Sequence, residues 1–216
     1  AETPDRGLSG VYAYPGTPST EITEYIQQHP LAAQRNVHRT WSSNEKTAME
    51  EALGMSFAGK RALVCMKHVG LNVAADAFVN SAMTGANGGL VVVAADDPSM
   101  HSSQNEQDSR FYGKFALVPT FEPADQQEAY DMAKAAFDLS ERFRIPVLMR
   151  LTTRMAHSRA VVETGEARAE NPLSHPEQPR QWVLMPGNSR VRYQTLLEDY
   201  ARLEEESAAS PFNAYT

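Results

Sequence analysis

The sequence contains a single cysteine, Cys65, among its 216 residues. One thiol excludes an internal disulfide framework, and it excludes a cysteine-ligated zinc site or an iron–sulfur cluster built from this chain alone. Cys65 lies inside the apolar run 62–66, where a small buried hydrophobic side chain is a more common role than a nucleophile. A chain without disulfides or a secretory signal is typical of a cytoplasmic protein.

Long hydrophobic runs and an excess of positive charge are also missing. No apolar run approaches the roughly 20 residues that a membrane-spanning helix needs, and residues 1–10 are too polar to be the core of a secretory signal. Twenty Lys and Arg stand against 27 Asp and Glu, which gives a net charge of −7. No basic stripe is present to neutralise phosphates, so the sequence argues against nucleic-acid binding. Neither a Walker A sequence nor a G-x-G-x-x-G fingerprint occurs.

The composition is that of a globular domain with a sizeable core, because 42% of residues are hydrophobic and 22% are charged. Short apolar runs alternate with helical patterns along most of the chain. The runs predict strands at residues 11–14, 37–41, 62–66, 90–95 and 146–151, and the clearest helices at 45–58 and 125–142. This alternation predicts an α/β domain, a mostly parallel sheet with helices on both faces.

The character of the sequence changes after Thr153. Residues 160–162 could form an edge strand, residues 165–181 are polar and proline-rich, and residues 189–206 predict a charged helix with a narrow apolar stripe. We therefore expect the α/β domain at residues 1–163. Residues 164–216 are expected to form a linker and a C-terminal helix that lead to a further domain.

Polar side chains gather in the loops that follow the predicted strands. In open parallel sheets, ligands bind beyond the carboxyl ends of the strands. Four loops are predicted at that edge: residues 15–20, 42–45, 67–72 and the long polar loop after Ala95. Because topology brings these loops together, the group predicts a site more strongly than any single member does.

Each candidate residue also has a structural interpretation. Glu45 lies in a first helical turn, where the helix dipole favours a carboxylate whatever its function. Thr17 lies in a constrained turn where it could hold a carboxylate or phosphate, or serve as ordinary turn and cap chemistry. Lys67 and His68 directly follow a buried strand, and His68 could exchange protons near neutral pH or be a satisfied loop histidine.

A metal site is not predicted. Asp96, Asp97 and His101 are close in sequence, but they lack a recognisable ligand spacing, and the Asp97–Pro98 pair is typical of a turn.

Four motifs occur in order along the chain: YPGTPSTEI at 14–22, NEKTAME at 44–50, MKHVGLN at 66–72 and SSQNEQDSR at 102–110. With these motifs the chain resembles the large subunit of indolepyruvate:ferredoxin oxidoreductase, from about Gly10 to about Val162. The resemblance implies a thiamine-diphosphate-dependent enzyme that oxidatively decarboxylates aryl pyruvates to acyl-coenzyme A. It also implies that this chain is the pyrimidine-binding domain.

The resemblance implies several groups that this chain does not hold itself. The sequence has no GDG-type diphosphate motif and no CxxC cluster, so Mg²⁺ and the [4Fe-4S] clusters are expected in other domains or partners. The implied partners are a diphosphate-binding domain or subunit, a second oxidoreductase subunit, ferredoxin and coenzyme A. A homo-oligomer is expected as well, because cofactors of this kind are shared across domain interfaces.

The resemblance assigns the chemistry to Glu45, which matches the family glutamate that hydrogen-bonds N1′ of the aminopyrimidine. A carboxyl that shares its proton with N1′ favours the 4′-imino tautomer, which removes the proton from C2 of the thiazolium. Glu45 is therefore the expected catalytic and cofactor-binding residue.

The remaining candidates surround Glu45. By the same resemblance, Thr17 would bind the carboxylate of the 2-oxoacid, and Lys67, His68 and Asn72 would form the pyrimidine and substrate pocket. Arg110 could pair with a substrate anion, but a structural salt bridge is an equally good interpretation.

One departure and one alternative accompany the resemblance. The family begins with a polar helix before the first strand, for which residues 1–10 are too short. The alternative is a non-catalytic α/β interaction module that retains the fold and only assembles with partner subunits. Retention of Thr17, Glu45 and the Lys67 loop favours the enzyme, and the side chain of the preferred 2-oxoacid stays open between indole, phenyl and branched-chain groups.

Overall fold

The computed structural model describes residues 7–176 and 178–213. It contains a six-stranded sheet in the order β2-β1-β3-β4-β6-β5, and all neighbouring strands are parallel. The strands are β1 (Gly10–Ala13), β2 (His38–Trp41), β3 (Ala62–Lys67), β4 (Leu90–Asp96), β5 (Thr120–Phe121) and β6 (Val147–Thr152). The predicted α/β fold is confirmed, with every strand parallel. The expectation that residues 1–10 are too short for a first helix falls mostly outside the described residues, which begin at residue 7.

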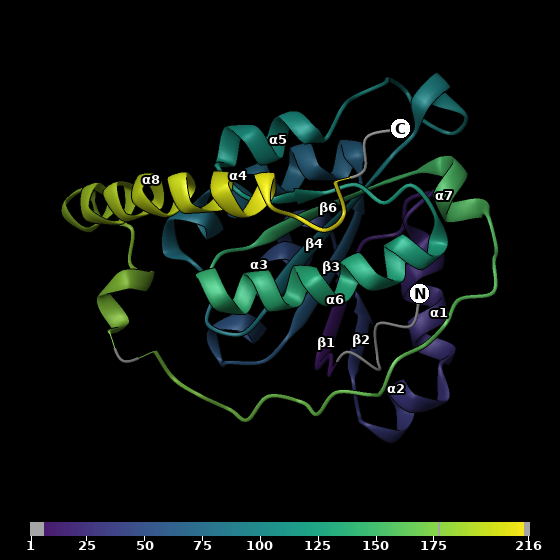
Figure 1. Cartoon of the computed structure of the whole chain (residues 1–216), viewed down its shortest axis with the longest axis horizontal. Helices are drawn as coiled ribbons and strands as arrows, with labels where there is room; N and C mark the ends of the chain where they lie inside the picture. The colour runs from purple at the N-terminus through teal and green to yellow at the C-terminus, as the bar shows by residue number, and fades with distance from the viewer. Residues whose placement is uncertain (1–6, 177, 214–216) are drawn as a thin grey trace.

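Helices cover both faces of the sheet (Figure 1). They are α1 (Thr20–Gln28), α2 (Pro30–Gln34), α3 (Glu45–Phe57), α4 (His68–Thr84), α5 (Arg110–Ala116), α6 (Gln126–Phe143), α7 (Thr153–His157) and α8 (Pro186–Ala208), with 3₁₀ turns η2 (Pro98–Met100) and η3 (Pro179–Trp182). Helices α1, α2 and α6 pack on one face, and α3, α4, α5 and α8 on the other. No helix in the described ranges is long and apolar enough to cross a bilayer.

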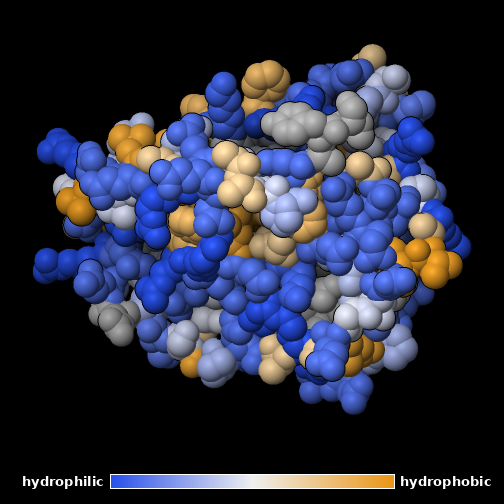
Figure 2. All heavy atoms as spheres, in the orientation of Figure 1, coloured by the Kyte–Doolittle hydropathy of each residue, from blue (hydrophilic) through white to orange (hydrophobic). Residues whose placement is uncertain are grey.

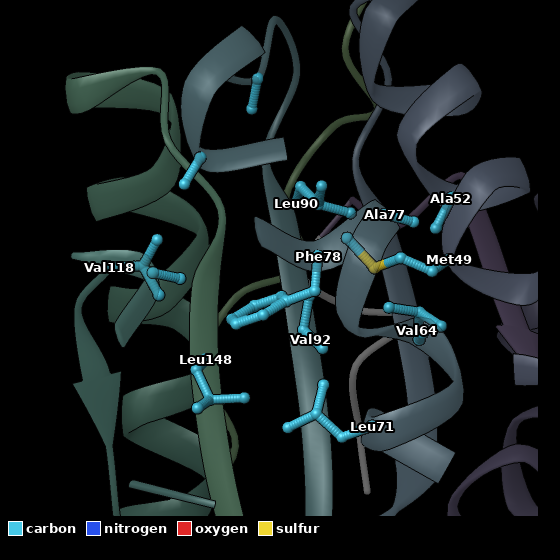
Figure 3. Packing of buried hydrophobic residues seen from close by; sticks show 14 of the residues in the cluster. Met49, Ala52, Val64, Leu71, Ala77, Phe78, Leu90, Val92, Val118 and Leu148 are labelled. Atoms are coloured by element: carbon cyan, nitrogen blue, oxygen red, sulfur yellow. The ribbon is translucent and has the colours of Figure 1, made fainter. Parts of the chain in front are cut away.

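The sheet divides the hydrophobic core in two. Alternate residues of each strand point to opposite faces, so that in β3 Leu63 packs toward α1 and α6 while Val64 packs toward α3 and α4. Figure 3 shows the second half of the core, where Met49 of α3 and Phe78 of α4 lie over Val64 and Val92. Because β3 and β4 are covered on both faces, their sequences are apolar almost throughout.

Helices α3 and α6 begin at carboxamide and carboxylate caps. The Asn44 side chain accepts a hydrogen bond of 2.9 Å from the backbone N–H of Thr47, and Asp125 accepts one of 2.8 Å from that of Glu128. A cap of this kind contributes about 1 kcal/mol. The cap at Asn44 also makes Glu45 the first residue of α3.

The strand order places a topological switch point between β1 and β3. From β1 the chain moves outward to β2, and it then crosses back to β3 on the other side of β1. Loops that leave neighbouring strands in opposite directions open a crevice at the carboxyl edge of the sheet, where ligands bind in α/β folds. From β4 the chain passes over β6 to the edge strand β5 and then returns to β6.

Three features of the secondary structure differ from the sequence prediction. The predicted loop 67–72 is wrong, because α4 begins directly at His68 with Lys67 as its extended N-cap. The predicted edge strand at 160–162 is also wrong, because these residues form no strand in the structure and Val161 is fully exposed. The sequence pattern does not predict the short elements α5, β5 and α7, which contain too few residues to show a period.

The segment after α7 packs on the domain. Residues 164–176 run in extended form along the amino-terminal edge of the sheet (Figure 1). Arg61 donates to the Ala169 carbonyl at 3.0 Å, and the Ser174 N–H donates to the Ala58 carbonyl at 2.9 Å. Helix α8 then lies along α4, where Arg192 Nε donates to the Met83 carbonyl at 3.0 Å.

We predict that α8 is part of the cooperative fold. Leu196 is buried in the core beneath α8, whereas its neighbour Leu197 is 40% exposed. Leu196→Ala should lower the free energy of unfolding by about 2–5 kcal/mol, because it leaves a cavity. Leu197→Ala should change it by only about 0.5 kcal/mol. Urea unfolding of both variants checks this, and equal effects would show that α8 does not contribute to the core.

Candidate functional site

The turn after β1 and the start of α4 meet at the β1–β3 switch point. Gly16 lies against Lys67, since a methyl group added at Gly16 would come 3.5 Å from Lys67 Cβ. Thr17 is exposed beside it, and its backbone carbonyl accepts a hydrogen bond of 3.3 Å from Ser102 Oγ. The structure therefore brings the predicted loops at Thr17, Lys67 and Ser102 together at one edge of the sheet.

Lys67 and His68 are both buried and both bind the long loop after β4. Lys67 Nζ donates to the Ser102 carbonyl at 2.7 Å, and His68 Nε2 lies 3.1 Å from the Asn105 carbonyl. Because a carbonyl only accepts, Nε2 is assigned the proton, which leaves Nδ1 as an acceptor. His68 Nδ1 is buried and has no hydrogen-bond partner among the described residues.

Glu45 lies over the first turn of α4. A methyl group added at Gly70 would come 2.6 Å from Glu45 Oε1, so the carboxylate occupies space that only a glycine at position 70 leaves free. Glu45 is half-buried. Within the described ranges the Glu45 carboxylate makes neither a hydrogen bond nor an ion pair. The nearby hydroxyl of Ser42 donates to a different carboxylate, that of Glu51. An unpaired carboxylate against a helix N-terminus is available to a ligand that donates a hydrogen bond.

Asn72 and Arg110 lie farther out. The Tyr112 hydroxyl donates to Asn72 Oδ1 at 2.5 Å. Arg110 forms a two-pronged pair with Asp108, at 2.9 Å from Nε to Oδ1 and 2.7 Å from Nη2 to Oδ2, and its Nη1 lies 3.5 Å from Glu122. Hydrogen bonding to Asp108 raises the pKa of Arg110, and the same contact lowers the pKa of Asp108. The structure thus shows Arg110 in a salt bridge, as in its structural interpretation, and a substrate anion would compete with two carboxylates.

A buried ion pair joins the end of β4 to the neighbouring strand β6. Asp96 is completely buried, and it accepts hydrogen bonds from Arg150 Nε at 2.6 Å and from the Ser109 N–H at 3.0 Å. Arg150 also bonds Glu122. The sequence interpretation misses this pair, although an arginine inside the apolar run 146–151 is the signal that could have revealed it.

Asp97 holds the beginning of the long loop. Its carboxylate accepts from the Ser102 N–H at 2.8 Å, Ser103 Oγ at 2.5 Å and Thr153 Oγ1 at 2.7 Å. Burial raises the pKa of Asp97, but these hydrogen bonds outweigh it and hold the pKa far below its usual range. Over residues 7–176 and 178–213, no group of three or more His, Cys, Asp or Glu side chains is placed to hold a metal ion.

Cys65 is fully buried in β3, as its apolar surroundings predict. Burial raises the pKa of the thiol to about 12. The thiol is therefore protonated at neutral pH and does not act as a nucleophile.

Comparison with known proteins identifies the family of the chain. The family described as "Pyruvate flavodoxin/ferredoxin oxidoreductase, thiamine diP-bdg" matches residues 6–209. The indolepyruvate oxidoreductase subunit IorA of Pyrococcus abyssi is 48% identical over 214 residues, which cover 96% of this chain and 33% of that protein. The IorA subunit of Archaeoglobus fulgidus is 46% identical over 214 residues, with 97% and 34% covered. The chain thus spans about a third of the length of these curated relatives.

Solved structures share the fold. A 2-oxoglutarate:ferredoxin oxidoreductase from Magnetococcus marinus superposes with a TM-score of 0.68 at 15% identity, over 99% of this chain and 44% of that chain. A thiamine-diphosphate-dependent 4-hydroxybenzoylformate decarboxylase from Rhodococcus jostii gives a TM-score of 0.59 at 19% identity, over 75% and 30%. At these identities the likeness shows the fold alone.

Proposed function

This chain belongs to the thiamine-diphosphate-binding family of pyruvate flavodoxin/ferredoxin oxidoreductases, and we propose that it is the pyrimidine-binding domain of an indolepyruvate-type 2-oxoacid:ferredoxin oxidoreductase. The proposed reaction is the oxidative decarboxylation of aryl pyruvates to acyl-coenzyme A, with ferredoxin as the electron acceptor. The names of relatives that are 41–48% identical support the aryl substrate. Branched-chain 2-oxoacids are the competing substrates to test.

The observation that carries the proposal is the unpaired Glu45 carboxylate held over Gly70. A protonated ring nitrogen is the kind of donor that this carboxylate lacks, so the residues fit the N1′ side of an aminopyrimidine. The buried acceptor His68 Nδ1, in the same turn of α4 as Gly70, is a second polar atom without a protein partner. A pocket for an apolar ligand would have neither feature.

The proposed mechanism assigns separate tasks to the chain's own residues. When bound, thiamine diphosphate would supply the nucleophilic carbon and accept the electrons that decarboxylation releases. Glu45 would hold a proton in a hydrogen bond to N1′, because a half-buried carboxylate keeps this bond out of competition with water. Thr17, exposed in the turn that leads into α1, would bind the carboxylate of the 2-oxoacid, and Lys67 would add positive charge beside it. Asn72 would lie at the outer edge of the pocket.

Other parts of the proposed enzyme would hold the remaining groups. We propose that a diphosphate-binding domain or subunit provides the Mg²⁺ site and that other domains or subunits hold the [4Fe-4S] clusters. Coenzyme A would be a substrate of the assembly. The division at residues 163 and 164, the homo-oligomer and the cytoplasmic location stay predictions.

The surface beside the site supports contact with such a domain. Phe111 and Phe115 of α5 are 71% and 72% exposed, and Val73 of α4 is exposed as well. Figure 2 shows hydrophobic side chains over α5, within a face that is otherwise largely hydrophilic. Large exposed apolar side chains next to a binding site are typical of an interaction surface.

Reconstitution tests the proposal. The chain, assembled with the remaining domains and subunits, should oxidise indolepyruvate in the presence of coenzyme A and reduce ferredoxin. Turnover should require added thiamine diphosphate. A complex that assembles but binds no thiamine diphosphate would instead indicate the non-catalytic interaction module.

A further inference from the structure

The loop between β4 and α5 is fixed at several points over the candidate site. Its first residue, Asp97, is almost completely buried at the end of β4. Beyond it, the Ser102 carbonyl accepts from Lys67 and the Asn105 carbonyl lies against His68. The loop therefore contacts the two buried polar residues that begin α4.

Ser102 connects three parts of the site. Its N–H donates to the Asp97 carboxylate, its carbonyl accepts from Lys67 Nζ, and its hydroxyl donates to the Thr17 carbonyl. The position of the Ser102 backbone thus determines where the Lys67 ammonium group lies. That backbone is itself fixed from the other side, by Asp97.

The conformation of the loop requires such an anchor. Ser99 and Met100 both have positive φ values, 66° and 53°, which side chains other than glycine adopt only when the surroundings impose them. The Met100 N–H donates to the Asp97 carbonyl at 3.0 Å, and the Ser99 N–H donates to Glu106 Oε2 at 2.8 Å. Without the contacts of Asp97, the strained turn would relax and carry Ser102 with it.

Asp97 suits this role because its carboxylate only receives hydrogen bonds. Its donors are His101, Ser102 and Ser103 on the loop and Thr153 at the start of α7. No cation within ion-pair distance of Asp97 is found in the described part of the chain. The carboxylate therefore ties the loop to the end of β4 and to the start of α7.

We propose that Asp97 is a positioning residue, which acts through the Ser102 backbone to hold the Lys67 ammonium group in the site. Asp97 touches neither substrate nor cofactor in this proposal. Its consequence for turnover rests on the proposed function, because Lys67 matters to catalysis only if the site binds the 2-oxoacid. Its effect on Lys67 itself does not depend on that function.

The test measures how fast an amine-acylating reagent labels Lys67 in the full chain, by mass spectrometry, with Lys60 as an internal reference. Lys60 Nζ also donates to a backbone carbonyl, that of Asn171 at 2.6 Å, but it lies at the opposite edge of the sheet. Loss of the charged hydrogen bonds in Asp97→Ala should raise Lys67 labelling relative to Lys60 by roughly tenfold or more. Asp97→Asn keeps an acceptor for the Ser102 N–H and should restore most of the protection.

Ser102→Ala is the matched control, because it removes only the hydroxyl and keeps both backbone contacts. Lys67 labelling in this variant should stay within roughly twofold of the wild type. An unchanged Lys67-to-Lys60 ratio in folded Asp97→Ala would overturn the proposal, and so would equal acceleration at both lysines. If Asp97→Ala does not fold, Asp97→Asn is the deciding variant. Its Lys67 labelling should rise roughly threefold while Lys60 labelling stays unchanged. No rise at Lys67 would overturn the proposal.

Turnover of the same variants in the assembled enzyme separates this proposal from the proposed function. Selective labelling of Lys67 together with a raised KM for the 2-oxoacid supports both. Selective labelling with unchanged kinetics supports the positioning role, and it argues against Lys67 as a substrate-binding residue.

Discussion

Glu45→Gln is expected to lower kcat of the assembled oxidoreductase by about 10²- to 10⁴-fold, the range associated with loss of a positioned acid–base group. Glutamine has nearly the same shape as glutamate, so it should still lie over Gly70. It cannot accept or return a proton, however. Because the substitution preserves the volume of the side chain, the loss of turnover would report on the charge and the proton of the carboxyl group. Steady-state oxidation of indolepyruvate is the measurement.

Glu50→Gln on the same helix is the matched control. Glu50 is exposed and lies 3.8 Å from Lys46, one turn away in an i,i+4 pair. Its replacement should leave kcat unchanged and cost less than about 0.5 kcal/mol of stability.

The alternative interpretation of Glu45 makes a different prediction. If the carboxylate serves only the dipole of α3, Glu45→Gln should cost about 0.3–1 kcal/mol of stability and leave turnover intact. The two outcomes are measured independently, by urea unfolding and by kinetics. Full activity in a slightly destabilised variant would contradict the catalytic role.

The sequence predicts the sheet well because local composition reflects burial. Strands β3 and β4 are covered on both faces, so nearly every one of their residues is apolar, and no other secondary structure of that length explains the pattern. The grouping of Thr17, Lys67 and the loop after β4 then follows from the parallel topology. The location of the site at the sheet edge is thus predicted from the strand order more than from any single motif.

What the sequence does not show is how the long loop is fixed. Ser102 has bonds to residues 35 and 85 positions away, Lys67 and Thr17, and no local pattern encodes such contacts. The loop assigned to residues 67–72 is wrong for a related reason. Its polar residues suggest a loop, but Lys67 and His68 are buried beneath another segment, which lets the helix begin at once.

The contact of Arg150 with Asp96 is likewise not encoded in any local sequence pattern. Its removal gives the second large expected effect. Arg150→Met should lower the free energy of unfolding by about 3–5 kcal/mol, because it leaves the fully buried Asp96 carboxylate without a cation. The pairing joins positions 54 residues apart. It exists because the register of β4 and β6 places Ala94 opposite Arg150 and brings the end of β4 within reach of the guanidinium. Urea unfolding of the chain measures the effect.

Two comparisons show whether the cost comes from the unpaired charge. Arg110→Met removes a guanidinium that is also paired with carboxylates, but an exposed one, and should cost less than about 1 kcal/mol. In the double variant Asp96→Asn/Arg150→Met the stranded charge is gone. The double variant should therefore be more stable than the sum of the single effects predicts, by about 1–3 kcal/mol. Strict additivity would mean that Arg150 stabilises the fold through its other contacts, among them the pair with Glu122, and that Asp96 is satisfied by Ser109 alone.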